Sequence, residues 1–345
     1  MRETFIDDLR LSEALPEKIY IEPASVCNLH CSICFRNGWI DEKQGFIDRP
    51  LFQKLCGELA RMTSVREVFF GGMGEPLCHP EICEMVSEVP ENIKKSLLTN
   101  ATLLTRQMSE GLARAGLDQL WISMDGFDRG CYETIQQGSL FRRILDNLAC
   151  FNEVRENTKM KLGITFVITP ENVAQLDRID DFADRFRADE LNISHMIPWQ
   201  AVKEEDWLYD RVNVPLGKMR RLSEGSAVTE PERCPFIHGS AVFVRWDGEV
   251  IPCMQLLHSY CTYLYEEKRK IRSFSYGNIG SRSLTDCWND EDYRDFRTRV
   301  DQFYFPFCLE CGGCEDRKEN LTDCFVSRSP ACGACLWSTG KVFCP

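Results

Sequence analysis

The sequence predicts an α/β fold in which a largely parallel sheet is covered by helices and followed by a smaller cysteine-rich domain. Between residues 18 and about 200, short apolar runs alternate with stretches of helical spacing. Residues 201–233 are polar and lack a clear period, and eleven of the nineteen cysteines lie from Cys234 onward. We therefore expect a lead-in over 1–17, a first domain over 18–200, a connector over 201–233 and a second domain over 234–345.

The elements of the first domain follow one another regularly. Six apolar runs predict strands at 18–23, 66–72, 96–100, 117–126, 161–169 and 191–198. Helical patterns follow at 50–62, 81–89, 105–116, 141–157 and 173–186, and Pro50 suits the first turn of the first helix. An open sheet and a partial barrel fit this alternation equally well. Both place functional residues at the carboxyl ends of the strands.

The second domain begins with a hairpin pattern. Residues 241–253 read as two strands joined by a turn at Asp247-Gly248, and residues 283–300 read as a helix that begins near a Ser/Asp cap. The last forty residues have too little apolar content for a core of their own. Such a segment needs bound metals to hold it together.

Composition narrows the class of protein. The net charge of −12 argues against a general nucleic-acid-binding or anionic-membrane-binding surface. No apolar run is long enough to span a bilayer, and the first residues lack the apolar region of a secretory signal. We therefore expect a cytoplasmic protein without nucleic-acid or membrane partners. Because the cytosol keeps thiols reduced, its cysteines favour metal or cluster ligation over disulfides.

Three cysteines follow the first predicted strand with the spacing C-x3-C-x2-C: Cys27, Cys31 and Cys34. A tetrahedral metal site needs four ligands, but a four-iron cluster held by three thiolates leaves one iron for a small molecule. A buried helix face and a zinc site with a distant fourth ligand are the alternative interpretations.

Further polar or glycine-rich segments end the other predicted strands, at 71–76, 99–102, 123–126 and 195–198. The glycines of 71–76 allow a ligand to approach the backbone closely, and the carboxylate of Glu75 suits an ammonium group on such a ligand. His195, Met196 and Trp199 are candidate substrate contacts, with core packing as the alternative. Because these motifs share one edge of the sheet, we expect a single site there.

The cysteine triplet and the following "GGMGEP" resemble the radical S-adenosylmethionine (SAM) superfamily. The resemblance implies a partial (β/α)6 TIM-like barrel and a SAM-binding 4Fe-4S cluster, whose free iron takes the amino and carboxylate groups of SAM. It also implies reductive cleavage of SAM to a 5′-deoxyadenosyl radical that abstracts hydrogen from a substrate.

The resemblance also implies roles for individual residues. Cys27, Cys31 and Cys34 match the cluster ligands, and the segment near the SAM amino group matches Gly71, Gly72, Gly74 and Glu75. Contacts to ribose and carboxylate match Asn100, Ser123 and Asp125, for which strand-end turns are the alternative. Ile33 stands where the family usually has an aromatic residue near adenine, so we expect an aliphatic contact there.

The C-terminal cysteines resemble the SPASM domain, through Cys234 and the spacing Gly248-x4-Cys253. This implies two auxiliary 4Fe-4S clusters, with candidate ligands Cys234, Cys253, Cys308, Cys311, Cys314, Cys324, Cys332, Cys335 and Cys344. We group Cys308, Cys311 and Cys314 in an outer cluster and Cys234, Cys253 and Cys324 in an inner one, and leave the last three open. Two zinc sites are the alternative.

Two segments, 255–270 and 332–345, are similar to radical SAM maturases of tungsten-cofactor oxidoreductases. This implies a tungsten–pterin enzyme of the aldehyde:ferredoxin oxidoreductase type, or its cofactor, as substrate. It also implies an electron donor such as ferredoxin or flavodoxin. The alternatives are a peptide or sulfatase-type maturase and, in a different class, a non-catalytic iron–sulfur or zinc adaptor.

Overall fold

The computed structural model describes residues 15–40, 42–201, 234–264, 266–308, 311–328 and 330–336, except for the side chain of His195. Most of the predicted lead-in, residues 202–233 of the predicted connector, and Cys344 lie outside the described residues.

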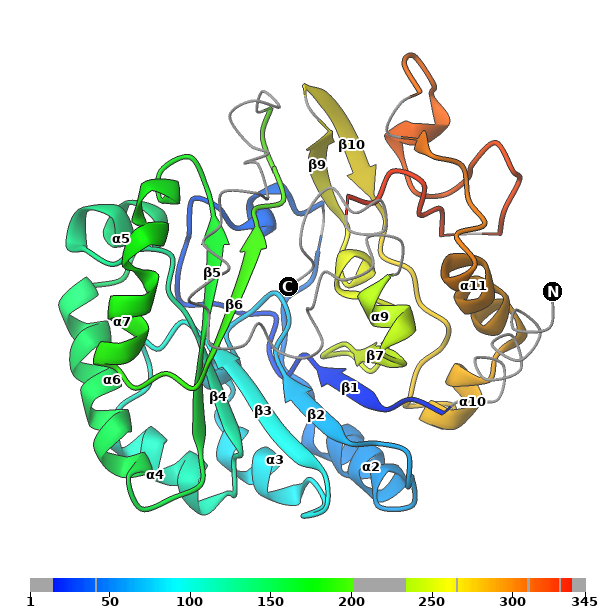
Figure 1. The fold of residues 1–345 in the computed structure, drawn as a ribbon. Helices are drawn as coiled ribbons and strands as arrows, with labels where there is room; N and C mark the ends of the chain where they lie inside the picture. The colour runs from blue at the N-terminus through cyan, green and yellow to red at the C-terminus, as the bar shows by residue number, and fades with distance from the viewer. Residues whose placement is uncertain are drawn as a thin grey trace, which may run out of the picture.

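One mixed sheet forms the centre of the molecule, with strand order β6-β5-β4-β3-β2-β1-β7-β8. Neighbouring strands run parallel except for the antiparallel pair β7–β8. This arrangement confirms the predicted α/β class, and the sheet curves as a partial TIM-like barrel (Figure 1). The strands are β1 Lys18–Ile21, β2 Glu67–Phe70, β3 Lys94–Thr99, β4 Gln119–Ser123, β5 Lys161–Ile168, β6 Glu190–His195, β7 Ala241–Val244 and β8 Val250–Ile251.

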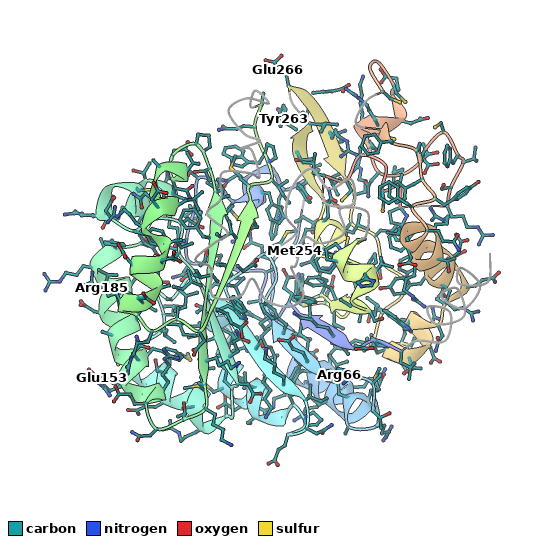
Figure 2. All side chains as sticks on the ribbon, in the orientation of Figure 1. Arg66, Glu153, Arg185, Met254, Tyr263 and Glu266 are labelled. Atoms are coloured by element: carbon teal, nitrogen blue, oxygen red, sulfur yellow. The ribbon has the colours of Figure 1, made fainter. Side chains whose placement is uncertain are left out.

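Helices of the first domain connect the parallel strands, and α4 to α7 follow one another along the outside of the sheet (Figure 1). Side chains of Asp48, Thr105 and Asp128 accept backbone hydrogen bonds and so begin three of these helices. Glu153 and Arg185 point outward from α6 and α7, whereas Met254 lies among the central elements (Figure 2). The helices are α2 Arg49–Leu59, α3 Ile82–Glu88, α4 Arg106–Arg114, α5 Arg129–Ile135, α6 Phe141–Arg155 and α7 Ile179–Arg185, with short 3-10 helices η1 Phe35–Gly38, η2 Pro76–Cys78 and η3 Val173–Arg178.

Two predicted helices are each divided in the structure. The pattern over 173–186 forms η3 followed directly by α7. The pattern over 283–300 forms α10 Leu284–Trp288 and α11 Glu291–Asp301. The side chain of Asp290 accepts a hydrogen bond from the backbone nitrogen of Asp292 at 3.1 Å and starts a new helix, which apolar spacing alone does not reveal.

The C-terminal hairpin is an extension of the barrel sheet. It forms as predicted, with Gly248 at φ +87° in the turn, a backbone angle that suits glycine. Its first strand, β7, pairs in parallel with β1, from Lys18 opposite Ala241 to Ile21 opposite Val244. The other C-terminal elements are α9 Pro235–His238, η5 Met254–Leu256, the antiparallel pair β9 Tyr260–Leu264 and β10 Glu267–Ile271, and η7 Asp316–Lys318.

The main core lies between the sheet and its outer helices, and it contains fully buried residues such as Val68, Leu97 and Leu120. Because β1 to β4 run parallel, their carboxyl ends bring four loops to one edge. Among the described helices, none combines the length and the apolar content needed to cross a bilayer.

Candidate functional site

The loop that follows β1 carries the three predicted cluster ligands, and we call residues 27–34 the rim loop. Cys27, Cys31 and Cys34 are each partly buried. Burial raises the pKa of all three thiols, and the nearby Cys34, Asp125 and Cys27 raise the pKa of Cys31 further. The three sulfur atoms therefore lie within electrostatic reach of one another. Three neighbouring thiols fit the donor set of a three-thiolate iron–sulfur cluster, whose iron would stabilise the thiolate form.

The end of β3 holds the first of these cysteines. The Asn100 side-chain amide donates to the Asn28 Oδ1 atom at 3.0 Å and approaches the Cys27 sulfur at 3.9 Å. Asn28 in turn donates to the Thr102 hydroxyl at 2.7 Å, and Thr102 donates back to Asn100. The predicted SAM contact Asn100 thus belongs to a polar network that orients the rim loop.

The glycine segment after β2 lies directly against the chain that leads into the rim loop. A Cβ atom on Gly74 would stand 2.1 Å from the Ala24 carbonyl oxygen, and one on Gly72 would stand 2.7 Å from the Glu22 side chain. Gly71 likewise faces the Phe69 ring. No larger residue fits at Gly74 without moving backbone, so the glycines allow the close approach that the sequence predicts.

The Glu75 side chain joins two strand ends. It is 2% exposed and accepts hydrogen bonds from the backbone of Leu77 at 2.9 Å, the Thr99 hydroxyl at 2.7 Å and the backbone of Asn100 at 2.8 Å. Burial raises its pKa to about 7 although these donors favour the charged form. Both oxygens therefore accept hydrogen bonds within the protein, which holds Glu75 against the end of β3.

Asp125 lies at the end of β4 and is 2% exposed. It accepts hydrogen bonds from the Gln136 amide at 2.8 Å, the Val167 backbone at 3.0 Å and the Ser123 hydroxyl at 3.3 Å. Burial raises its pKa, and its charge raises the pKa of Cys31 and Cys34. Asp125 and Ser123 thus lie beside the rim loop, as predicted. Gln136 was missed, because nothing in a residue at a helix end signals this long-range contact.

The aliphatic and aromatic residues near the rim loop pack toward the second domain. Ile33 packs against an apolar cluster that includes Met73 and Met196, and the ring centre of Phe35 lies 5.0 Å from that of Tyr260. The Trp199 indole donates to the Ser32 carbonyl oxygen at 2.6 Å. Core packing, the alternative interpretation, therefore describes Met196, while Trp199 supports the rim loop directly.

A buried histidine and two carboxylates link the rim to the second domain, and the sequence analysis did not single them out. His258 Nε2 lies 2.9 Å from a Glu22 oxygen, and His258 Nδ1 lies 2.9 Å from a Glu42 oxygen. Glu22 also accepts a hydrogen bond from the backbone of Met73 at 3.0 Å. Burial lowers the pKa of His258, but the two carboxylates outweigh this and raise it to about 8. The imidazolium therefore ties β1 and the glycine segment to the C-terminal chain.

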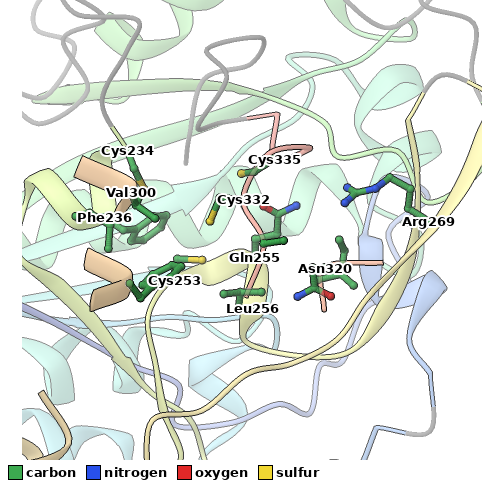
Figure 3. A pocket seen from close by; sticks show the side chains of 14 residues that line it. Cys234, Phe236, Cys253, Gln255, Leu256, Arg269, Val300, Asn320, Cys332 and Cys335 are labelled. Atoms are coloured by element: carbon green, nitrogen blue, oxygen red, sulfur yellow. The ribbon is translucent and has the colours of Figure 1, made fainter. Parts of the chain in front are cut away.

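Four cysteines of the second domain, Cys234, Cys253, Cys332 and Cys335, line one pocket, which we call the inner pocket (Figure 3). Burial raises the pKa of Cys234 to about 12, and Cys335 contributes to this rise. Cys253 and Cys332 also have raised thiol pKa values, from burial and from the other pocket cysteines. Within the described residues, no three His, Cys, Asp or Glu side chains form a ready-made site for a single metal ion. The four thiols fit the donor set of one 4Fe-4S cluster.

Three cysteines of the last part of the chain form a second set, which we call the outer group: Cys308, Cys311 and Cys324. Burial, together with the nearby Cys311 and Cys324, raises the pKa of Cys308 to about 11, so these thiols are neighbours. Cys311 and Cys324 are exposed. The interpretation that grouped Cys324 with Cys234 and Cys253 differs from this placement, since the inner pocket is completed by Cys332 and Cys335.

Comparison with known proteins separates the chain into the same two parts, one with the rim loop and one with the C-terminal cysteines. The profile of the radical SAM superfamily matches residues 21–183, and that of an iron–sulfur cluster-binding domain, SPASM, matches residues 234–315. The chain is 31% identical to a tungsten-containing aldehyde ferredoxin oxidoreductase cofactor-modifying protein from Pyrococcus furiosus, over 95% of this chain and 96% of that protein.

Two further matches are more distant. The chain is 23% identical to a PqqA peptide cyclase from Gluconobacter oxydans, over 92% of this chain and 90% of that protein. Among solved structures, Streptococcus suis SuiB bound to S-adenosylmethionine superposes with a TM-score of 0.61 at 19% identity, over 90% of this chain and 74% of that chain. At this identity the likeness to SuiB concerns the fold.

Proposed function

Because the chain belongs to the radical SAM superfamily and carries a SPASM domain, we propose that it matures a tungsten–pterin enzyme, or the cofactor of such an enzyme, by radical chemistry. One observation supports this class of substrate, namely the 31% identity to the cofactor-modifying protein over 95% of the chain. The chain is an enzyme of the radical SAM/SPASM maturase type. The step from that type to a tungsten enzyme is the proposal.

In this proposal, the rim loop holds the SAM-binding 4Fe-4S cluster through Cys27, Cys31 and Cys34. When bound, the cluster supplies the electron that cleaves SAM to a 5′-deoxyadenosyl radical. Asn100 orients Cys27, and Glu75 fixes the glycine segment so that its backbone can approach SAM. We assign contacts with SAM to Gly71, Gly72, Gly74, Glu75, Asn100, Ser123, Asp125 and Ile33.

The second domain would hold two auxiliary 4Fe-4S clusters. We assign one to the inner pocket, with Cys234, Cys253, Cys332 and Cys335 as its ligands. The outer group supplies the other, with Cys308, Cys311 and Cys324 supported by their neighbouring thiols, and Cys314 or Cys344 completing it. A ferredoxin or flavodoxin would deliver the electrons. The domain limits at residues 18–200 and 234–345 remain part of this proposal.

Peptide maturation is the second candidate function. It is supported by the match to a PqqA peptide cyclase, which extends over 92% of this chain. The two candidates differ in the partner that the protein recognises. Binding assays with a purified pterin–tungsten oxidoreductase and with short peptides would separate them, and retention of the oxidoreductase alone favours the first.

The decisive test is detection of 5′-deoxyadenosine after reduction of the anaerobically reconstituted protein with dithionite in the presence of SAM. We expect about twelve irons per chain if three four-iron clusters form. Replacing Cys27, Cys31 and Cys34 together with Ala should abolish SAM cleavage and leave about two-thirds of the iron. Stoichiometric zinc without iron would contradict both candidates and favour the non-catalytic adaptor.

A further inference from the structure

Arg269 is a buried arginine on β10, with 4% of its surface exposed. It lines the inner pocket together with Cys253, Cys332 and Cys335. Figure 3 shows its guanidinium group pointing into the pocket, toward Gln255 and the side on which Cys335 lies. A permanent positive charge therefore stands within a cavity whose other ionisable groups are thiols.

The hydrogen-bond partners of Arg269 are neutral. Its Nη1 atom donates to the Ala334 carbonyl oxygen at 3.1 Å, and its Nε atom donates to the Arg317 carbonyl oxygen at 2.5 Å. Among the described residues, no carboxylate forms an ion pair with it. A buried charge is costly unless it is paired with an opposite charge. An anion bound near Arg269 would therefore stabilise it, and no described carboxylate provides one.

Two nearby arginines show the usual solutions to this problem. Arg297 is also buried, but its guanidinium lies 3.9 Å from the ring centre of Trp288 and 4.5 Å from that of Tyr293. Arg317 forms an ion pair with Glu267. Arg269 has neither arrangement within the described residues, and the ionisable groups that raise its pKa are Cys335, Tyr260 and Cys308.

Arg269 also lies where the inner pocket meets the outer group. Cys335 of the inner pocket and Cys308 of the outer group are the two thiols that interact with its charge. They are close to each other because the Cys308 backbone nitrogen donates to the Gly333 carbonyl oxygen at 2.8 Å. A Cβ atom on Gly333 would stand 2.7 Å from the Cys308 sulfur. Arg269 thus lies near a cysteine of each set, whereas among the described residues the neighbouring Arg317 reaches the outer group alone, through the Cys311 carbonyl oxygen.

We propose that Arg269 is the shared counter-charge of the two auxiliary iron–sulfur sites and raises the reduction potential of both. The inference rests on the proposed function, since it needs clusters at both sites. Reduction adds negative charge to a cluster, and a fixed cation at short range in a poorly solvated pocket stabilises the reduced form. Burial lowers the pKa of Arg269, but a guanidinium keeps its proton at any working pH.

The test uses the full-length chain with Cys27, Cys31 and Cys34 replaced by Ala, so that only the auxiliary clusters remain. In this background, Arg269→Met removes the charge and keeps an unbranched, apolar side chain. Potentiometric titration followed by electron paramagnetic resonance should show both auxiliary potentials shifted to more negative values. We expect about a tenfold change in each reduction equilibrium, which is about 59 mV for a one-electron couple.

Two variants control the measurement. Arg269→Lys keeps the charge and should stay close to the parent. Lys270→Gln removes a cation from the next position of the same strand, where the side chain is half exposed and only 3.9 Å from Glu319, and should leave both potentials unchanged. If Arg269→Met loses auxiliary iron while Arg269→Lys retains it, the requirement for a positive charge is supported.

Three outcomes overturn the inference. Unchanged potentials in Arg269→Met do so directly. A shift of only one potential overturns the shared role, and loss of iron from both Arg269 variants shows that packing, rather than charge, is what matters. Failure of the proposed function looks different, because the parent background itself would then bind no iron or would bind zinc.

Discussion

The rim loop and the inner pocket both gather cysteines, but their surroundings differ. The rim loop offers three thiols among polar side chains, with Asn100 and Asp125 nearby. The inner pocket offers four thiols among mostly aliphatic and aromatic side chains, such as Phe236, Leu256 and Val300, with Arg269 as a buried cation. Polar neighbours suit a site that must bind and release a charged ligand, whereas an apolar wall suits a cluster that stays in place. The surroundings of the thiols therefore suit the rim loop to a cluster that binds a ligand and the inner pocket to a cluster that does not.

Removal of the proposed cluster ligands from the inner pocket should have the largest effect, and it should affect the inner pocket without affecting the rim loop. Replacing Cys253 and Cys335 with Ala should lower the iron content by about four of about twelve atoms, since the rim loop and the outer group keep their own ligands. SAM cleavage driven by dithionite should continue. Iron analysis and 5′-deoxyadenosine measurement test this. Loss of SAM cleavage along with the iron would show that the two regions are not independent.

A glycine substitution probes how tightly the rim is packed. Gly74→Ala places a Cβ atom 2.1 Å from the Ala24 carbonyl oxygen, so the chain leading into the rim loop must move. We expect a loss of about 1–3 kcal/mol in the free energy of unfolding, together with weaker SAM binding, measured by denaturant titration and calorimetry.

Gly57→Ala is the matched control for this change. Gly57 lies on the exposed face of α2 and has no atom within 4 Å of the added Cβ. The substitution should stabilise the protein by about 0.5–1 kcal/mol, because alanine favours a helix interior more than glycine does. Equal effects of the two substitutions would show that the rim has no special constraint.

The last prediction concerns the contact of His258 with Glu22 and Glu42, and its effect depends on pH. The pKa of His258 is raised to about 8 from an unfolded value near 6.5. Its contribution to the free energy of unfolding is therefore fully present below about pH 6.5 and is lost as the pH rises through 8. This shift corresponds to about 2 kcal/mol. The charged groups that face His258 are Glu22 and Glu42, with Arg245 close to both carboxylates.

The measurement compares the melting temperature of the parent and of His258→Gln between pH 6 and pH 9, both without metal. The parent should lose more stability than the variant across this range. The comparison is needed because the raised pKa of Glu75, about 7, also makes stability fall as pH rises, and this effect is common to both proteins. Parallel curves would show that folding does not raise the pKa of His258.

Much of the first domain could be predicted from the sequence because its signals are local. The alternation of apolar runs with helical spacing indicates parallel strands, and the short spacing of Cys27, Cys31 and Cys34 keeps three thiols within one loop whatever the rest of the chain does. Gly74 likewise follows directly from a strand end. Such features depend on residues a few positions apart, whose relative placement is limited by chain connectivity alone.

The tertiary structure alone decided the contacts between distant parts of the chain. Glu22 and His258 are 236 residues apart, and their pairing depends on how β7 adds to β1. The same holds for the inner pocket, where Cys332 and Cys335 rather than Cys324 join Cys234. Sequence spacing does not determine such partners, because the entropic cost of closing a long loop changes little with loop length. Many pairings of distant residues therefore cost about the same, and side-chain packing decides which of them forms. The sequence thus determined which cysteines and strand-end residues are candidates for the chemistry, and the fold decided which of them lie together.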